Sequence, residues 1–251
     1  MKPIALQLYT LREAAKVDFI GVLKRVAAIG YKGVEPAGLH GIAPKDFRRI
    51  VEDLGMVISS THSPWASADN LPETIDTLRE LGVTTVIGGY GAKEFNDLSS
   101  ITATAEMVEG MDRTLRAAGI TLTLHNHWME FERLDDGQLK FDLFTQLAPN
   151  VRFEMDTYWA SNFGANDAVE LVKRYGHRCP LLHIKDGTLE RNRPLLPVGS
   201  GKMDIPAVIN AAGPVTEWLV VEQDDSETDM FACVESSYRY LTENGLAAGN
   251  R

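Results

Sequence analysis

The chain has 251 residues, with 25 Lys and Arg against 35 Asp and Glu, so its formal net charge is −10. This acidic balance argues against a nucleic-acid-binding protein, because neutralising phosphates requires clustered Lys and Arg. No apolar stretch approaches the roughly 18 residues that suggest a membrane span, so we expect a globular protein with neither kind of partner.

Short apolar runs alternate with helical segments along the chain, and several of the helical segments end in Gly. Gly suits the left-handed residue that closes a helix, and short apolar runs without polar alternation are typical of strands buried on both faces. Strands are predicted near residues 3–8, 33–36, 57–62, 84–88, 121–126, 151–156, 180–185 and 218–222. Helices are predicted near residues 18–29, 44–54, 71–81, 99–118, 142–148, 167–175, 204–212 and 229–244.

Eight strand–helix units in a chain of this length match a closed (β/α)8 TIM barrel, which is the α/β fold we predict. A doubly wound open sheet is the competing architecture. It is disfavoured because no GxGxxG turn follows the first strand. No linker or low-complexity run interrupts the chain, so residues 1–251 are predicted to form a single domain.

Polar residues gather at the ends of the predicted strands, where a (β/α)8 barrel carries its active site. Four histidines share this position: His62, His125, His127 and His183. Glu35, Asp156 and Glu222 follow apolar residues and would be costly to bury unpaired. Carboxylates and imidazoles at one mouth predict a site for one divalent ion, either Mn²⁺, Mg²⁺, Co²⁺ or Zn²⁺. For any single histidine, a hydrogen-bonded structural role is the alternative.

Other residues near the strand ends have two interpretations each. Glu154 alternates with Asp156, so it faces the barrel interior with it or forms a salt bridge elsewhere. Lys185 shares a strand face with His183, so it reaches the mouth or extends its amine to solvent. Three tryptophans either wall a sugar pocket or pack loops: Trp65, Trp128 and Trp159. The run VGSGK at 198–202 lacks P-loop spacing, which favours a plain turn over a phosphate-binding loop.

Several motifs, taken together and in order, resemble those of a known family. They are QLYTLR at 7–12, GVE at 33–35, HNHWMEF at 125–131, Asp156, HIKD at 183–186, VGSG at 198–201 and VEQD at 221–224. With them the chain resembles the sugar phosphate isomerase/epimerase family of the xylose isomerase-like TIM-barrel superfamily, which also holds endonuclease IV. The resemblance extends from Gln7 to Asp224 and identifies the superfamily better than the substrate.

The resemblance implies one divalent metal ion bound by Glu, Asp, His and Glu from strands five to eight. The last three ligands correspond to Asp156, His183 and Glu222. Many members end strand five with Glu, whereas this chain has His125 there and a Glu five residues later. The HNHxxEF pattern favours Glu130 as the first ligand, and His125 or His127 stays open as the alternative.

The chemistry expected from such a site is isomerisation, epimerisation or dehydration of a keto-sugar, sugar phosphate or polyol through an enediolate. The metal acts as a Lewis acid, and acid and base groups move the proton. The candidate catalytic residues are Glu130, Glu222, His125 and His127. The candidate substrate-binding residues are Arg12, Glu35, His62, Lys185 and Trp128.

Two other functions compete with this one. A metal-dependent phosphodiesterase resembling endonuclease IV is disfavoured by the charge of −10 and by too few additional His and Asp for a three-zinc cluster. A catalytically silent sugar-binding barrel would have lost a metal ligand, whereas a complete set of candidate metal ligands is present.

The two cysteines, Cys179 and Cys233, form no CxxC motif, which fits reduced thiols in the cytoplasm. The expected partner is a small carbohydrate, and a homo-oligomer is left open.

Overall fold

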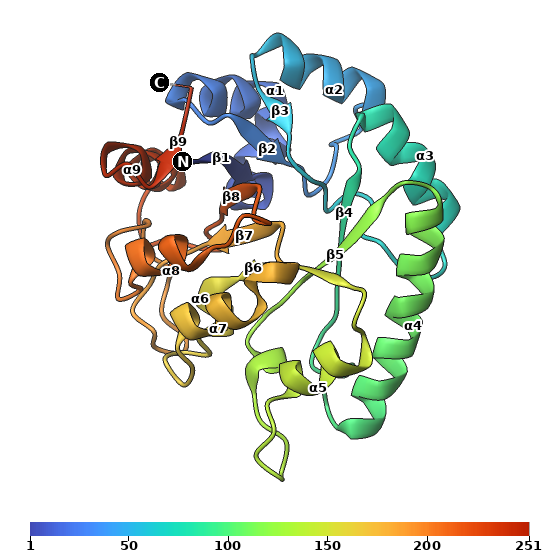
Figure 1. Ribbon diagram of the computed structural model, residues 1–251. Coiled ribbons are helices and arrows are strands. Elements are labelled where there is room, and N and C mark those ends of the chain that lie inside the picture. The colour runs from blue at the N-terminus through green and yellow to red at the C-terminus, as the bar shows by residue number, and fades with distance from the viewer. Residues whose placement is uncertain (251) are drawn as a thin grey trace.

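The computed structural model describes residues 1–250, which form a ring of parallel strands surrounded by helices (Figure 1). The strands are β1 (Lys2–Gln7), β2 (Gly33–Glu35), β3 (Val57–Ile58), β4 (Thr85–Gly89), β5 (Thr121–His125), β6 (Arg152–Asp156), β7 (Leu181–Ile184) and β8 (Trp218–Val221). They pair in the order β3-β2-β1-β8-β7-β6-β5-β4. A bridge between Thr61 and Val86 joins the two ends of this order. The predicted (β/α)8 barrel is therefore confirmed.

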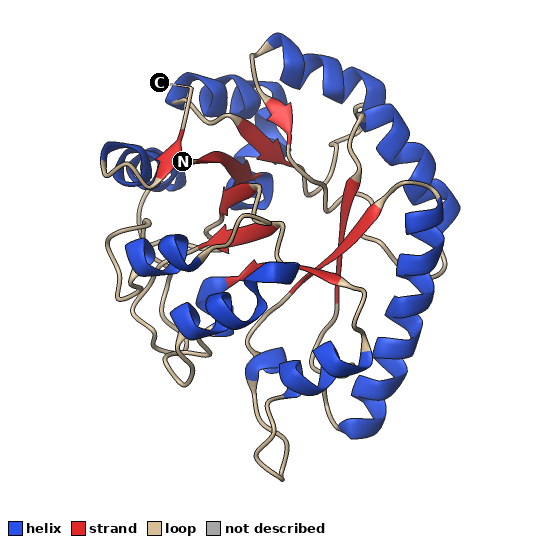
Figure 2. Cartoon of the chain, viewed as in Figure 1, coloured by secondary structure: helices blue, strands red, loops and turns tan. Residues whose placement is uncertain are grey.

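Helices cover the outside of the ring in the alternating pattern that the sequence predicts (Figure 2). The α-helices are α1 (Arg12–Ile29), α2 (Pro44–Asp53), α3 (Leu71–Leu81), α4 (Leu98–Ala117), α5 (Lys140–Leu147), α6 (Thr157–Ala160), α7 (Ala168–Tyr175), α8 (Ile205–Ala211) and α9 (Met230–Glu243). Short 3-10 turns η1 (Leu8–Leu11), η2 (Met129–Phe131) and η3 (Gly176–Arg178) follow β1, β5 and α7. A two-residue strand, β9 (Ala247–Ala248), pairs with β1 near the two chain ends. Of the helices in residues 1–250, none combines the length and apolar character that a membrane span needs.

Three elements differ from the prediction. The first helix begins at Arg12 rather than near 18, but it is kinked at Asp18, whose Oδ1 accepts a hydrogen bond from Gly21 N as an N-cap does. The third strand is shorter than expected, because pairing passes from β2 to β4 over residues 59–62. The short helix α6 was not predicted; it begins where the Asp156 carboxylate accepts a hydrogen bond from Trp159 N.

The barrel interior is layered along its axis, because alternate residues of each strand point inward. A small apolar cluster of Ala5, Ile87, Leu181 and Val220 is separate from the main core between strands and helices. Two residues further along these and neighbouring strands, the inward side chains become polar: Gln7, His183 and Glu222. The apolar cluster thus closes one end of the barrel, and the polar chemistry lies toward the carboxyl ends of the strands.

Candidate metal centre and substrate pocket

The outer polar layer, at the carboxyl ends of β6, β7 and β8, is organised around the buried amine of Lys185. Its Nζ lies 2.9 Å from Asp156 Oδ2, 2.8 Å from Glu222 Oε2 and 2.9 Å from Asp224 Oδ2. Burial raises the pKa of Asp156 to about 6, against the lowering effect of Lys185. Burial also acts to raise the pKa of Glu222, but the charges of Lys185 and then His183 hold it well below its usual value. Lys185 therefore reaches the mouth, where it compensates carboxylates that would be costly to bury alone.

The inner polar layer lies below and contains Glu35, His62, Glu154 and His183. Glu154 Oε2 is 2.7 Å from His62 Nε2 and 3.1 Å from His183 Nε2. On the other side, Glu35 Oε1 is 3.1 Å from His62 Nε2 and 2.8 Å from His183 Nε2. Glu35 is held further by Gln7 Nε2, which donates a hydrogen bond of 2.7 Å, and by the hydroxyl of Ser60. The two carboxylates of this layer thus face imidazoles rather than open water.

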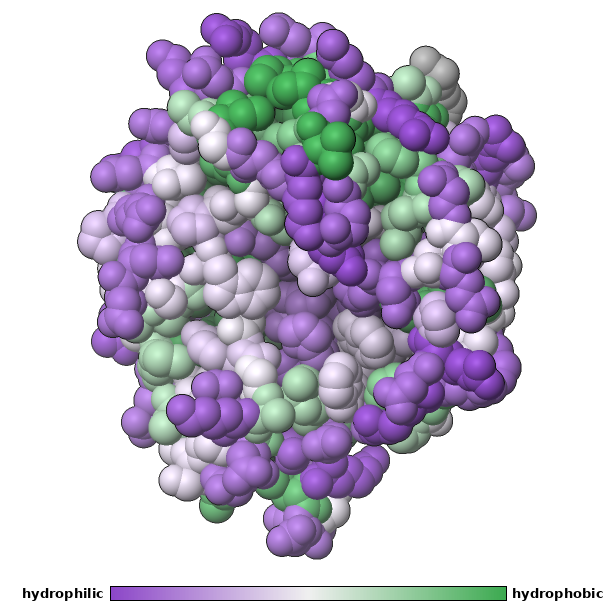
Figure 3. Space-filling model, turned by 180° about the vertical axis from the view of Figure 1, so that it is seen from behind, coloured by the Kyte–Doolittle hydropathy of each residue, from purple (hydrophilic) through white to green (hydrophobic). Residues whose placement is uncertain are grey.

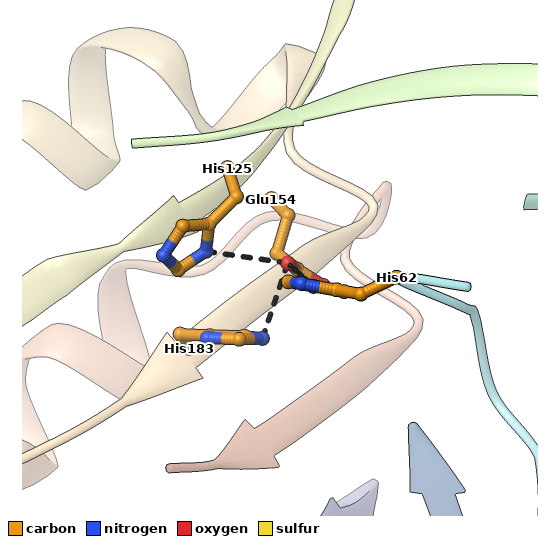
Figure 4. Close-up of side chains that lie close together, drawn as sticks. All are labelled: His62, His125, Glu154 and His183. Carbon is orange, nitrogen blue, oxygen red and sulfur yellow. Dashed lines mark hydrogen bonds and ion pairs between the residues drawn. The ribbon is translucent and has the colours of Figure 1, made fainter. Parts of the chain in front are cut away.

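Three imidazoles surround the carboxylate of Glu154, as Figure 4 shows. His125 Nδ1 is 3.3 Å from Glu154 Oε2, beside the contacts with His62 and His183. The side chain of Glu154 is fully buried. Burial acts to raise its pKa, but the charges of His183 and then His62 lower it well below the usual value. Of the two interpretations of Glu154 from the sequence, the structure shows the inward-facing one.

Two overlapping groups of possible metal ligands occur among residues 1–250. The first consists of His125, Asp156, His183 and Glu222, and the second of His62, His125, Glu154 and His183. In each group the ligand atoms lie within 4.8 Å of one another. The first group offers two imidazole nitrogens and two carboxylate oxygens, a donor set that suits Zn²⁺, Co²⁺ or Mn²⁺. Within the described chain, His125 Nδ1 and Asp156 Oδ2 have no hydrogen-bond partner, although His125 Nδ1 lies 3.3 Å from Glu154 Oε2 and Asp156 Oδ2 is ion-paired with Lys185. The residues present therefore fit a divalent ion.

Glu130, which the sequence favoured as the first ligand, is in neither of the groups found among residues 1–250. Its Oε2 accepts a hydrogen bond of 3.1 Å from His127 N. The side chain borders a small cavity together with Phe141 and Phe144. Burial there raises the pKa of Glu130 to about 8. The structure instead brings His125, the alternative left open, into the group with Asp156.

A cavity of about 560 Å³ opens over the outer layer. Among the predicted residues, those that line it are Arg12, His62, His125, His127, Lys185 and Glu222. Glu35 is fully buried in the layer below, and Trp128 lines a neighbouring cavity. On the face drawn in Figure 3, the surface is hollowed near its centre and hydrophilic residues lie in the hollow.

The cavity is also lined by Trp65 and Trp159, two of the tryptophans for which a wall of a sugar pocket was one of two interpretations, and by Arg193 and Asp225, which were not predicted to bind substrate. The position of Trp159 was indicated by the sequence, because this residue follows the end of β6. Arg193 and Asp225 come from irregular loops, where neither strand ends nor periodicity indicates a position.

The glycine-rich run 198–202 binds a carboxylate of the chain itself. Asp186 Oδ2 accepts hydrogen bonds of 3.0 Å from Gly199 N and 2.9 Å from Gly201 N. Its Oδ1 accepts hydrogen bonds of 2.8 Å from Gly187 N and 3.1 Å from Met203 N. These amides are occupied, so the run serves as a turn anchored to the end of β7 rather than as a phosphate-binding loop.

The family model of the xylose isomerase-like TIM barrel matches residues 23–241. No curated protein sequence matches the chain. Among solved structures, a sugar phosphate isomerase/epimerase from Parabacteroides distasonis is 26% identical with a TM-score of 0.79, and the match covers 98% of this chain and 96% of that one.

Two more distant structures share the fold. The probable 3-DHS dehydratase AsbF from Bacillus anthracis is 11% identical with a TM-score of 0.75, covering 96% of this chain and 99% of that chain. The IolI protein with a bound zinc atom is 14% identical with a TM-score of 0.74, covering 97% of each chain.

Proposed function

The chain belongs to the xylose isomerase-like TIM barrel family, and on that premise we propose that it is a divalent-metal-dependent isomerase, epimerase or dehydratase of a keto-sugar. The observation that carries the proposal is the convergence of His125, Asp156, His183 and Glu222, whose ligand atoms lie within 4.8 Å of one another; His125 and Glu222 of this group line the 560 Å³ cavity. A bound divalent ion supplies Lewis-acid polarisation of the sugar carbonyl. The solved relatives described as a sugar phosphate isomerase/epimerase and a probable dehydratase support this class of reaction.

Lys185 and His62 are proposed to bind and orient the sugar. Both line the cavity, and both are held in place by buried carboxylates: Lys185 by Asp156 and Glu222, and His62 by Glu154. The positive charge of the Lys185 amine would stabilise oxygens that gain negative charge when the carbon beside the carbonyl loses its proton. Arg12 is proposed to bind hydroxyls at the rim, because its guanidinium lines the cavity and is anchored to Asp224 O at 2.6 Å.

His127 and Glu222 are proposed to carry the proton. His127 lines the cavity and is only partly buried, and burial lowers the pKa of its imidazole below the usual value. A neutral imidazole accepts a proton from the carbon beside the carbonyl, which leaves an enediolate. Proton return to the other carbon completes an isomerisation, return to the opposite face completes an epimerisation, and protonation of a departing β-hydroxyl completes a dehydration.

A neutral sugar is proposed rather than a sugar phosphate, because the charges around the cavity balance. The basic side chains lining it are Arg12, His62, Lys185 and Arg193, and the acidic ones are Glu222, Asp224 and Asp225. Against the lowering effect of burial, the buried carboxylates of Glu35 and Glu154 raise the pKa of His62 to about 9, and they balance its charge. Lys185 is already surrounded by three carboxylates, so little uncompensated positive charge faces the cavity. A phosphate dianion would need at least one free basic cluster.

The proposal is tested by metal binding and by proton exchange. Metal-stripped protein is titrated with Zn²⁺, Co²⁺ and Mn²⁺ by calorimetry, and we expect one ion per chain. Asp156→Asn should weaken binding, whereas Glu132→Gln should not, because Glu132 lies at the surface and pairs with Lys140. The loaded protein is then incubated with keto-sugars in D2O, and deuterium at the carbon beside the carbonyl is measured by NMR. Absence of metal binding, or metal binding without exchange in any sugar, would overturn the proposal.

A further inference from the structure

A second cavity of about 370 Å³ adjoins the cavity of about 560 Å³, which is called the catalytic cavity below. Trp159, Arg193 and Asp225 line both cavities, so the two share a wall. Trp159 is also close to the metal ligands, because the Lys185 amine that contacts Asp156 and Glu222 lies 5.4 Å from the centre of the Trp159 ring. The catalytic cavity alone falls within the 300–1,000 Å³ that usually holds a whole small ligand, so the second cavity is space beyond what one sugar ring requires.

Three aromatic rings form a corner of the second cavity. Trp128 and Trp159 are 5.5 Å apart between ring centres, and Phe163 is 5.9 Å from Trp128 and 5.8 Å from Trp159. All three rings are partly exposed, and none belongs to the hydrophobic core clusters found in residues 1–250. The sequence left open whether such tryptophans wall a pocket or pack loops, and their place at the cavity supports the first.

The backbone is bent to place the Phe163 ring in this corner. Asn162 and Phe163 have φ values of 45° and 55°, a left-handed conformation that is a genuine outlier for a bulky residue. Arg191 holds the pair, because its Cζ lies 4.3 Å from the Phe163 ring centre and its Nη2 donates to Asn162 Oδ1 at 3.2 Å. Strained backbone of this kind persists where the surrounding structure maintains it and is concentrated at functional sites.

Polar groups stand around the aromatic corner. Asn192, Arg193 and Asp225 are exposed residues that line the second cavity. Aromatic faces beside amide, guanidinium and carboxylate groups suit a ring that has an apolar face and hydrogen-bonding groups at its edge. The guanidinium of Arg193 and the carboxylate of Asp225 also reach the catalytic cavity, so they face the position where two linked rings would join.

We propose that the substrate is a glycoside with two linked rings. The keto-sugar unit that reacts lies in the catalytic cavity, with its carbonyl at a ring carbon other than the anomeric carbon that the glycosidic bond occupies. The second ring stacks in the corner formed by Trp128, Trp159 and Phe163. This inference rests on the proposed function for the identity of the reacting unit. The second ring is recognised by its flat face, which a sugar and an aromatic aglycone share, and the experiment separates these two sources.

The test compares one-ring with two-ring ligands on the metal-loaded protein by calorimetry. The probes are methyl glycosides, phenyl glycosides and disaccharides of the gluco, galacto and manno series, which have no ketone and are compared for binding alone. At least one two-ring ligand should bind about tenfold more tightly than the methyl glycoside of the same sugar. Preference for phenyl glycosides would identify an aromatic aglycone, and preference for disaccharides would identify a second sugar.

Two substitutions test whether the preference for two-ring ligands arises from the corner formed by Trp128, Trp159 and Phe163. Trp128→Ala and Phe163→Gly should each remove the advantage of two-ring ligands. In Phe163→Gly methyl glycosides and metal should bind as before, because Gly suits the left-handed backbone at 163. Phe231→Ala is the matched control, because Phe231 also stacks under an arginine, Arg25, at 3.7 Å but lies outside both cavities. Equal binding of one-ring and two-ring ligands, or an advantage that survives both corner variants, would overturn the inference and leave the proposed function standing. Failure of every probe to bind would also overturn the inference, whereas the proposed function is decided by deuterium exchange into keto-sugars.

Discussion

Replacement of Glu130 by Gln should make the metal-free protein more stable above pH 8 relative to the wild type. The Glu130 side chain is 3% exposed and borders a cavity lined by Phe141, Phe144 and Phe153. Burial in these surroundings raises its pKa from 4.5 to about 8, against the lowering effect of its hydrogen bonds with backbone amides. The folded protein therefore keeps a proton on Glu130 that the unfolded chain releases near pH 4.5. Gln has nearly the same shape and carries no ionisable group.

The sign and size of the difference in unfolding free energy follow from the difference in proton binding between the folded and unfolded states. Between pH 4.5 and about 8 the folded state binds more protons than the unfolded state, so the contribution of Glu130 to the free energy of unfolding decreases as pH rises. It is fully present below pH 4.5 and is lost as pH rises through 8. A pKa difference of about 3.5 corresponds to roughly 4 to 5 kcal/mol. Wild type and Glu130→Gln should therefore be similar near pH 4.5 and separate by about 4 kcal/mol near pH 8.

Urea unfolding followed by circular dichroism at pH 5, 6, 7, 8 and 9 measures this difference. Glu132→Gln is the control, because its carboxylate is 41% exposed and pairs with Lys140 at 3.0 Å; its curve should run parallel to the wild type. A parallel curve for Glu130→Gln as well would refute the assignment of a buried, protonated acid. Zinc titration of the same variant separates the two ligand hypotheses: unchanged affinity supports His125, and a large loss of affinity would restore Glu130 as the first ligand.

Three further variants test the site. Glu154→Gln should weaken Zn²⁺ binding by about 10- to 100-fold in calorimetry, because Glu154 orients the imidazoles of His125 and His183; unchanged affinity would mean that it does not position them. Glu222→Gln should abolish turnover with an unchanged circular dichroism spectrum, and retained activity would remove Glu222 from the mechanism. His127→Ala should slow deuterium exchange into the sugar by about 10²- to 10⁴-fold while one metal ion still binds per chain, and exchange at the native rate would show that His127 is a spectator.

The barrel was predictable because its signals are local. Short apolar runs and helix-ending glycines are each readable within a few residues, and the rule that active sites lie at strand ends then indicated Asp156, His183 and Glu222. The contacts of Glu154 were not readable in this way. They depend on the register between neighbouring strands, which sets His125 beside Glu154 and Asp156 beside His183. Spacing along one strand gives the face of a residue, but not its level in the barrel relative to the next strand.

Loop residues were less predictable still, and for a different reason. Phe163 and Arg193 reach the cavities from irregular segments, and Phe163 does so with a backbone conformation that propensity argues against. The position of Glu130 shows the same limit. The pattern HNHxxEF places a Glu near the mouth in sequence, but the turn η2 directs its carboxylate back to His127 N and toward aromatic side chains.

The imidazole at the end of β5 has a consequence for the kind of ion that the site would hold. With Glu at that position, three carboxylates and one imidazole would face a divalent ion; with His125 there are two of each. The exchange removes one negative charge from a site that already contains the amine of Lys185, 2.8 Å from Glu222 and 2.9 Å from Asp156. Charge attraction for a hard ion such as Mg²⁺ is therefore reduced, while a second nitrogen donor is gained. Because imidazole suits Zn²⁺ and Co²⁺ better than it suits Mg²⁺, we expect the donor set of this chain to rank those two ions first.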